Sequence, residues 1–191
     1  MPIDSKTITI IALFASIAIV LNLSPLKIPS PFASYLIFQV WEIPIVIAFL
    51  LYGLKVGVTI SIVNTVILFF VFPGALPTGP IYNLIAVLST LFGIYIVKFF
   101  FTKHFNTGKE AILTTFSTGI AIIFRVVIMS LVNWIVLRYP PPIGYAIEPN
   151  ALPPFIVATA LFNATIVLYS IPIAYIIARA VTLRTKNTIW N

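Results

Sequence analysis

Six long runs of apolar residues, separated by short polar or proline-containing segments, make up most of this chain of 191 residues. A helix needs about 20 apolar residues to cross the hydrocarbon core of a bilayer. Continuous apolar runs of this kind favour helices over a membrane barrel. We therefore predict an all-α integral membrane protein, a compact bundle of six transmembrane helices, in which residues 1–191 form a single membrane domain. The expected helices are 8–23, 40–54, 56–72, 81–101, 111–137 and 155–181.

The composition excludes most alternatives to a membrane protein. Only 8% of the residues are charged and 61% are hydrophobic, whereas soluble domains carry about 25% charged residues. A soluble enzyme, a disordered segment and a nucleic-acid-binding module are thereby ruled out. The absence of Cys excludes disulfides and thiolate metal sites, and a single histidine, His104, argues against a histidine metal cluster, so we expect no metal site.

The basic residues predict the orientation in the membrane. If the N-terminus is cytoplasmic, the inner segments contain eight basic residues and the outer ones only Lys27 and Arg138. This is a positive-inside bias, and it places both termini in the cytoplasm. The formal charge of +7 is then an orientation signal and not a nucleic-acid footprint. The eight inner residues are Lys6, Lys55, Lys98, Lys103, Lys109, Arg179, Arg184 and Lys186.

The prolines follow the opposite distribution. The outer segments 24–39, 73–80 and 138–154 contain 12 of the 15 prolines. Proline restricts the backbone and lowers the entropy of a loop. Stiff, apolar outer loops favour a pocket that opens outward over loops that merely cap the helices.

Arg125 is the most unusual residue, because it lies in the middle of the fifth run. An arginine at that depth is costly and therefore needs a partner. It could pair with Glu42, the one acid within an expected span, or with an anionic group of a substrate. Asn133 lies eight residues later, about two helical turns, so both side chains can share one face.

Four asparagines within or at the ends of the apolar runs are candidates for ligand binding. An amide offers both a donor and an acceptor, which suits the edge of a heteroaromatic ring or a hydroxyl chain. Hydrogen bonding between helices is the competing interpretation. Trp134, beside Asn133 at the outer end of its helix, strengthens the binding interpretation there. The four are Asn64, Asn83, Asn133 and Asn163.

The first helix carries small residues, Ala12, Ala15 and Ser16, that could pack inside the bundle or present a flat face to a partner. The chain has no phosphate-binding G-x-x-x-x-G-K-[ST] motif, no H-E-x-x-H and no pair of intramembrane aspartates. We therefore expect no enzyme and no ion-coupled pump, but a membrane protein that binds a small molecule and takes its energy from elsewhere.

Several segments, in order along the chain, resemble the substrate-binding (S) subunits of energy-coupling factor (ECF) vitamin transporters, the riboflavin-specific branch above all. Each motif is weak alone, and their order carries the resemblance. The segments are Leu-Lys-Ile-Pro-Ser-Pro-Phe at 26–32, Phe-Gln-Val-Trp-Glu-Ile-Pro at 38–44, Leu-Tyr-Gly at 51–53, Thr-Gly-Pro-Ile-Tyr-Asn at 78–83, Met-Ser-Leu-Val-Asn-Trp at 129–134 and Leu-Phe-Asn at 161–163.

The resemblance implies a multi-pass protein in the plasma membrane of a prokaryote, with a vitamin pocket near the outer surface. It also implies docking through Ala12, Ala15 and Ser16 onto a transmembrane coupling protein, which two cytoplasmic ATPases drive. ATP would be bound only by those partners, and the chain itself would need no cofactor. The expected pocket residues are Asn133, Asn163, Asn83, Arg125, Glu42, Lys27, Phe32, Trp134 and Asn64.

Three positions depart from the riboflavin branch. Ile166 and Val63 stand where that branch carries lysines, and Gln39 stands where it has an acid. Riboflavin is the first ligand to expect. The alternatives are another vitamin or small precursor, a stand-alone facilitator, and a scaffold subunit with no transport role.

Overall fold

Six α-helices dominate the computed structural model, which describes residues 4–32, 36–71, 76–101 and 110–185. The predicted all-helical membrane fold is confirmed, and the helix bounds lie within a few residues of those expected. The elements are α1 (Ser5–Leu23), β1 (Ile28–Pro29), β2 (Ile37–Phe38), α2 (Glu42–Tyr52), α3 (Leu54–Val71), α4 (Gly79–Phe101), α5 (Glu110–Val136), the short 3-10 helix η1 (Pro149–Ala151) and α6 (Leu152–Thr185).

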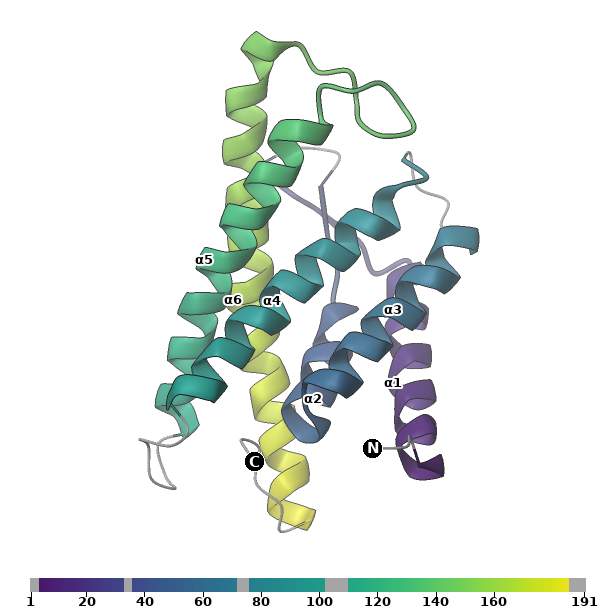
Figure 1. The fold of residues 1–191 in the computed structure, drawn as a ribbon, viewed down its shortest axis with the longest axis vertical. Coiled ribbons are helices and arrows are strands. Elements are labelled where there is room, and N and C mark those ends of the chain that lie inside the picture. Colours follow the sequence, from purple (N-terminus) through teal and green to yellow (C-terminus); the bar gives the residue numbers. More distant parts are fainter. Residues whose placement is uncertain (1–3, 33–35, 72–75, 102–109, 186–191) are drawn as a thin grey trace.

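The helices form two groups that meet along α2 and α4. Figure 1 shows α4, α5 and α6 on one side and α1 and α3 on the other, with the short α2 between them. The start of α1 and the end of α6 lie at the same end of the molecule, which we call the inner end. The α5–α6 connection lies at the opposite, outer end. Lys103, Lys109 and Lys186, three of the eight inner basic residues, and the single histidine His104 fall outside the described residues.

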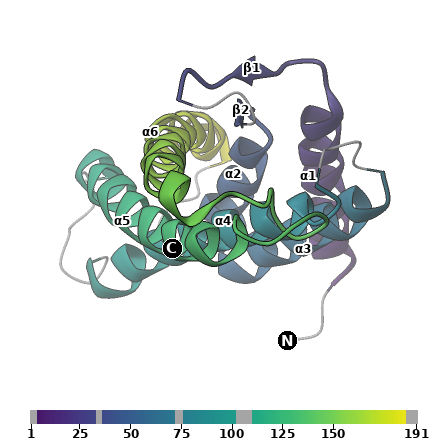
Figure 2. The same ribbon diagram turned by 90° about the horizontal axis from the view of Figure 1, so that it is seen from above.

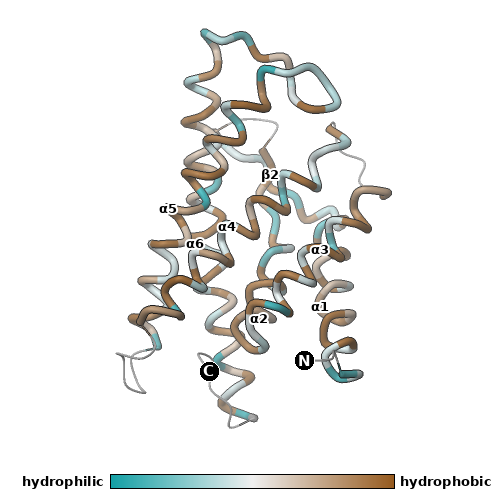
Figure 3. Tube along the Cα trace, in the orientation of Figure 1, coloured by the Kyte–Doolittle hydropathy of each residue, from teal (hydrophilic) through white to brown (hydrophobic). Residues whose placement is uncertain are grey.

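Five of the helices in the described part are long and apolar enough to cross a membrane. Hydrophobic residues dominate their whole length (Figure 3), and large apolar side chains such as Phe70 and Leu183 are exposed on the outside of the bundle, where lipid can cover them. The sides of the bundle thus have the apolar character that the hydrocarbon core of a bilayer requires.

α2 departs from the prediction of six full spans. It has only 11 residues, which corresponds to about 16 Å and is too short to cross the membrane. This helix is apolar because protein, and not lipid, surrounds it. The residues from Glu42 to Leu50 are all buried, and the other helices lie around α2 (Figure 2). A helix enclosed on every side is apolar all round.

A two-stranded antiparallel ribbon, β1–β2, connects α1 to α2 where only a loop was expected. Ile28 pairs with Phe38 and Pro29 pairs with Ile37. The ring of Phe38 stacks on Phe162 of α6, with ring centres 4.9 Å apart. The ribbon is thereby held against α6 at the outer end of the bundle.

α4 and α5 approach each other unusually closely. A Cβ atom placed on Gly93 would lie only 2.5 Å from the Cα of Ala121, so only glycine fits there. The helices are antiparallel, and one turn further toward the outer end Thr90 of α4 faces Arg125 of α5. The close approach therefore places these two polar side chains within hydrogen-bonding distance.

The outer connection between α5 and α6 is folded back on itself and tied to α4. The backbone N–H of Ala146 donates to the carbonyl of Tyr139 at 2.8 Å. From the start of α4, the hydroxyl of Thr78 donates to the carbonyl of Pro142 at 2.6 Å, and the hydroxyl of Tyr82 donates to the carbonyl of Ile143 at 2.7 Å. This part of the outer surface is an ordered wall.

Candidate ligand-binding cavity

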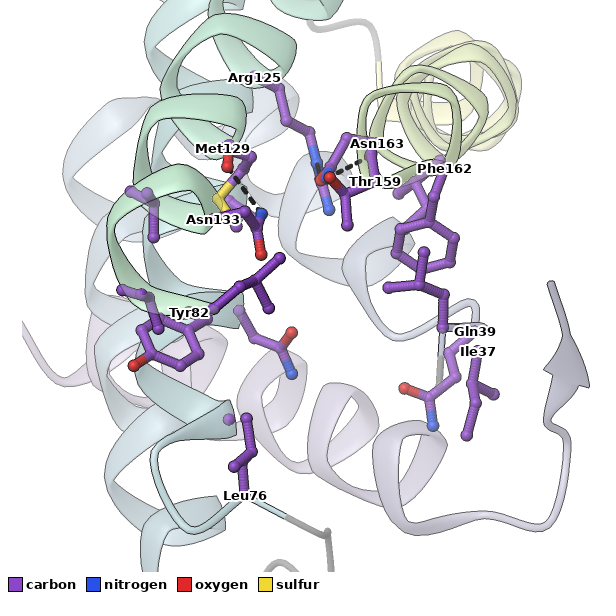
Figure 4. Close-up of a pocket in the computed structure, with 18 of the residues that line it drawn as sticks. Ile37, Gln39, Leu76, Tyr82, Arg125, Met129, Asn133, Thr159, Phe162 and Asn163 are labelled. Atoms are coloured by element: carbon purple, nitrogen blue, oxygen red, sulfur yellow. Dashed lines mark hydrogen bonds between the residues drawn. The ribbon is translucent and has the colours of Figure 1, made fainter. Parts of the chain in front are cut away.

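A cavity of about 400 Å³ lies in the outer half of the bundle, enclosed by α4, α5, α6, the start of α2 and strand β2. Its size is within the range of about 300–1,000 Å³ that is usual for small-molecule sites. Figure 4 shows Met129 and Asn133 of α5 on one side of it and Phe162 of α6 on the other, with Ile37 and Gln39 on the same side as Phe162 and with Arg125 and Asn163 between the two sides. The prediction of a pocket near the outer end thus has a structural counterpart.

The inner end of the cavity is formed by an ion pair between Arg125 and Glu42. The guanidinium binds the carboxylate through two N–H groups, one of them at 2.8 Å from Oε1 and the other in close contact with Oε2. Arg125 is 2% exposed and Glu42 is 3% exposed. The ion pair that the sequence suggested is therefore present, and both partners also line the cavity.

Two further side chains hold Arg125 in place. Its Nε–H donates to Oδ1 of Asn163 at 2.8 Å. The nitrogen Nη1, which contacts Oε2 of Glu42, donates its second N–H to the hydroxyl of Thr90 at 3.1 Å. Asn163 in turn donates to the carbonyl of Thr159 at 2.8 Å. Four of the five guanidinium N–H groups are thus used within the protein. Because a buried charge is tolerated only when it is paired and hydrogen-bonded, this arrangement explains how an arginine is accommodated at that depth.

Asn133 is differently placed from Asn163. One of its N–H groups donates to the carbonyl of Met129 at 2.7 Å, one turn earlier in α5. Its carbonyl oxygen points into the cavity (Figure 4). An amide has one acceptor oxygen and two donors, so Asn133 offers an acceptor and a second donor to a ligand. Asn83, at the start of α4, also lines the cavity.

The remaining walls are mostly apolar. Phe162, stacked on Phe38, forms one wall, and Met129 lies across the cavity from it. Ile166 lies in the lining at the position where the riboflavin branch carries a lysine. An apolar cavity with a few fixed polar groups is typical of a site for a small organic molecule.

Four of the predicted pocket residues do not line this cavity. Lys27 and Phe32 are exposed beside the β1–β2 ribbon. Trp134 is 47% exposed because it is one residue, about 100° of helix rotation, away from Asn133; the guanidinium of Arg138 lies over its ring. Asn64 is buried on α3, which packs on α1, α2 and α4 and contributes nothing to the cavity.

Several residues near the cavity were not predicted from the sequence. Thr159 of the lining and Thr90, which binds Arg125 but does not itself line the cavity, gave no signal in the sequence beyond their spacing from other polar residues. Gln39, noted only as a departure, lines the cavity, and its side-chain N–H donates to the carbonyl of Asn22 at 3.2 Å. Tyr82 and Tyr145 line the outer part. Partial burial raises the pKa of the Tyr145 phenol above its usual value, so the group stays neutral at physiological pH.

The small residues of α1 divide between two faces. Ala12 and Ser16 are exposed, and the Ser16 hydroxyl donates to the carbonyl of Ala12 at 2.8 Å. Ala15 is 2% exposed and packs in the core of the bundle. The three residues therefore do not form one surface: Ala12 and Ser16 are one turn apart, whereas Ala15 points inward.

No family model matches the chain, and no curated protein matches it significantly. Among solved structures, the chain is similar to one described as the S component of a bacterial ECF transporter, at 22% sequence identity. The match covers 95% of this chain and 98% of the other, with a TM-score of 0.75. Within the described residues no group of three His, Asp or Glu side chains could hold a metal ion. The TM-score and the coverage of the match show that the chain has the fold of an ECF-transporter S component.

Proposed function

We propose that this protein is the substrate-binding subunit of an ATP-driven ECF importer and binds a small vitamin, riboflavin first, in the cavity between α4, α5 and α6. The observation that carries the proposal is this cavity of about 400 Å³, with Asn133 directed into it, in a chain with the S-component fold.

The chemistry of the cavity suits a flat, uncharged ring system. Phe162 and Met129 offer apolar surfaces to the faces of such a ring. The Asn133 amide offers an acceptor and a donor to a ring edge that alternates carbonyl and N–H groups, as the pyrimidine edge of a flavin does. Asn83, which also lines the cavity, is a suitable partner for a hydroxylated chain.

Ile166 is the observation that favours a second candidate, another vitamin or small precursor of similar size. An isoleucine provides no charged donor at this point of the lining. A ligand that relies on a lysine there would bind weakly. A smaller or more apolar ring would bind without that loss.

The chain would act without catalysing a reaction. Energy would come from two cytoplasmic ATPases through a transmembrane coupling protein, and ATP would be bound only by those partners. On this proposal the exposed side of α1 that carries Ala12 and Ser16 faces the coupling protein. The setting would be the plasma membrane of a prokaryote, with both termini in the cytoplasm.

The test uses a tryptophan that the cavity itself supplies. Trp41 lines the cavity and is 4% exposed, so a bound flavin should quench its fluorescence. A Trp134→Phe, Trp190→Phe variant leaves Trp41 as the single tryptophan. Titration with riboflavin should quench its emission and raise the melting temperature, and a copurified flavin would give yellow absorption. If neither riboflavin nor any other vitamin in a panel changes emission or melting temperature, the proposal is wrong.

Two further measurements test the transport role. Uptake into vesicles should require the coupling protein and the ATPases, whereas a stand-alone facilitator would transport without them. In a scaffold protein, Asn133→Ala would change stability without changing any ligand affinity.

A further inference from the structure

Most of the residues that line this cavity are uncharged. Among the described residues that line it, only Glu42 and Arg125 carry a charge, and they are paired with each other. We propose that this closed ion pair makes the cavity select uncharged ligands and reject the ionised forms of molecules of the same shape. The inference rests on the proposed binding function, and it names the class of ligand.

The geometry keeps Arg125 from serving as an anion receptor. Its guanidinium donates to both carboxylate oxygens of Glu42, to Asn163 and to Thr90. One guanidinium N–H is left for a single hydrogen bond, but a ligand carboxylate or phosphate could take Arg125 as its own counter-ion only by displacing Glu42. That displacement would leave the Glu42 carboxylate buried without a counter-charge, which is a severe penalty in a low-dielectric interior.

The geometry also keeps Glu42 from serving as a cation receptor. Its Oε1 and Oε2 each accept a bond from the guanidinium, and the residue is 3% exposed. A cationic ligand that took the place of the guanidinium would leave Arg125 buried and unpaired. The pair therefore presents no net charge to either sign of ligand.

No other charge in the described part of the chain compensates a ligand inside the cavity. The charged residues of the outer connections, Lys27, Arg138 and Glu148, are exposed to the surroundings and do not line it. An ionised ligand would lose its hydration shell without gaining a partner of opposite charge. The polar groups that do line the cavity, among them Asn133, Asn83 and Gln39, are neutral.

The test compares pairs of vitamins that share one scaffold and differ in charge. The pairs are riboflavin and riboflavin 5′-phosphate, biotinamide and biotin, panthenol and pantothenate, and nicotinamide and nicotinate. Binding to the full-length wild-type protein is measured by thermal shift, and Trp41 emission is followed in the full-length Trp134→Phe, Trp190→Phe variant. For any scaffold that binds, the neutral member should bind at least about tenfold more tightly than the charged one.

A variant then reverses the preference. Glu42→Gln keeps the shape and an acceptor but leaves the Arg125 charge without its counter-ion. The ratio of anionic to neutral affinity should rise by about tenfold or more relative to wild type. Glu148→Gln removes the same charge from the exposed outer connection and should leave the ratio unchanged. The double variant Glu42→Gln, Arg125→Gln restores neutrality and should restore the preference for neutral ligands.

The outcomes separate this inference from the proposed function. If wild type binds both members of a pair equally, charge selection is overturned while ligand binding is supported. If a neutral vitamin other than riboflavin binds more tightly than its charged partner, the ligand is corrected and charge selection is supported. If wild type binds no member of any pair, the binding function fails and the inference fails with it. Should Glu42→Gln not fold, the wild-type ratios and the double variant still decide between these results.

Discussion

Replacing Gly93 by alanine tests whether the close contact between α4 and α5 organises the cavity. The added Cβ would lie 2.5 Å from the Cα, 2.9 Å from the N and 3.1 Å from the Cβ of Ala121. Two of these neighbours are backbone atoms, so relief requires the helices to move apart by about 1 Å. Overpacking of this kind costs about 1–3 kcal/mol. The gain from replacing glycine by alanine in a helix is about 1 kcal/mol, so the net loss of stability should be up to about 2 kcal/mol.

Gly119 of α5 provides the matched control. A Cβ there would meet nothing within 4 Å, and the residue is exposed. Gly119→Ala should therefore keep the helix-propensity gain without the clash and should stabilise the protein by about 0.5–1 kcal/mol. Thermal unfolding of the purified protein in detergent measures both variants, and a change of 1 kcal/mol corresponds to about 2–4 °C in a chain of this size.

The second readout is ligand affinity. Gly93 lies one turn from Thr90, whose hydroxyl accepts a bond from Arg125 at 3.1 Å. Separation of the helices would lengthen this bond and loosen the inner end of the cavity, so Gly93→Ala should weaken ligand binding and Gly119→Ala should not. If Gly93→Ala melts at or above the wild-type temperature and binds ligand normally, the argument from the close approach is refuted.

Four other predictions concern the cavity, its wall, the core and the first helix. Asn133→Ala should weaken ligand binding by about 1–3 kcal/mol, through the loss of the directed amide, while Trp134→Leu outside the cavity should leave the titrated affinity unchanged; equal losses would contradict the site. Gly144→Ala should lower the melting temperature, because its Cβ would collide with the carbonyl of Val136 and lie 2.6 Å from that of Tyr139; an unchanged value would contradict the tight outer turn. Phe49→Ala should cost about 3–5 kcal/mol in unfolding experiments, since Phe49 is 1% exposed in the core; a loss below about 1 kcal/mol would mean that the core is looser than described. Hydrogen bonding by the Thr7 side chain and by the Thr7 N–H lowers the pKa of the Asp4 carboxyl. The stabilisation by this cap is therefore present at neutral pH and lost as the pH falls through the lowered pKa. The difference in melting temperature between wild type and Asp4→Ala should shrink in acid, and a difference that grows there would contradict the assignment.

The helices could be predicted from the sequence because long apolar runs have few alternatives in a chain with so little charge. The bounds of α4 and α5 differ from the expected ones by at most two residues at either end. The span of α2 was overestimated, since an apolar run has the same appearance whether lipid or protein surrounds it. The β1–β2 ribbon escaped detection because four paired residues leave no periodic signal.

The candidate site was predictable where burial energetics allowed few solutions. Arg125, in the middle of its apolar run, and Glu42, the one acid within an expected span, each needed a partner, and they bind each other. The choice among neutral residues was not predictable in this way. Trp134 and Asn133 are neighbours in sequence but lie on different faces of α5, and Asn64 is as buried as Asn163 yet lies away from the cavity. For such residues the rotation and packing of each helix decide, and one sequence does not reveal them.

The shortness of α2 has a consequence for the origin of the cavity. A full-length helix in this central position would fill the middle of the bundle from one membrane surface to the other. α2 begins at Glu42, at the inner end of the cavity, and extends only toward the inner end of the bundle. The cavity therefore occupies the space that the outer half of a full-length helix would fill, and the β1–β2 ribbon lies beside that space. The residue at which α2 begins sets the depth of the site, and one additional helical turn before Glu42 would take about 5.4 Å from it.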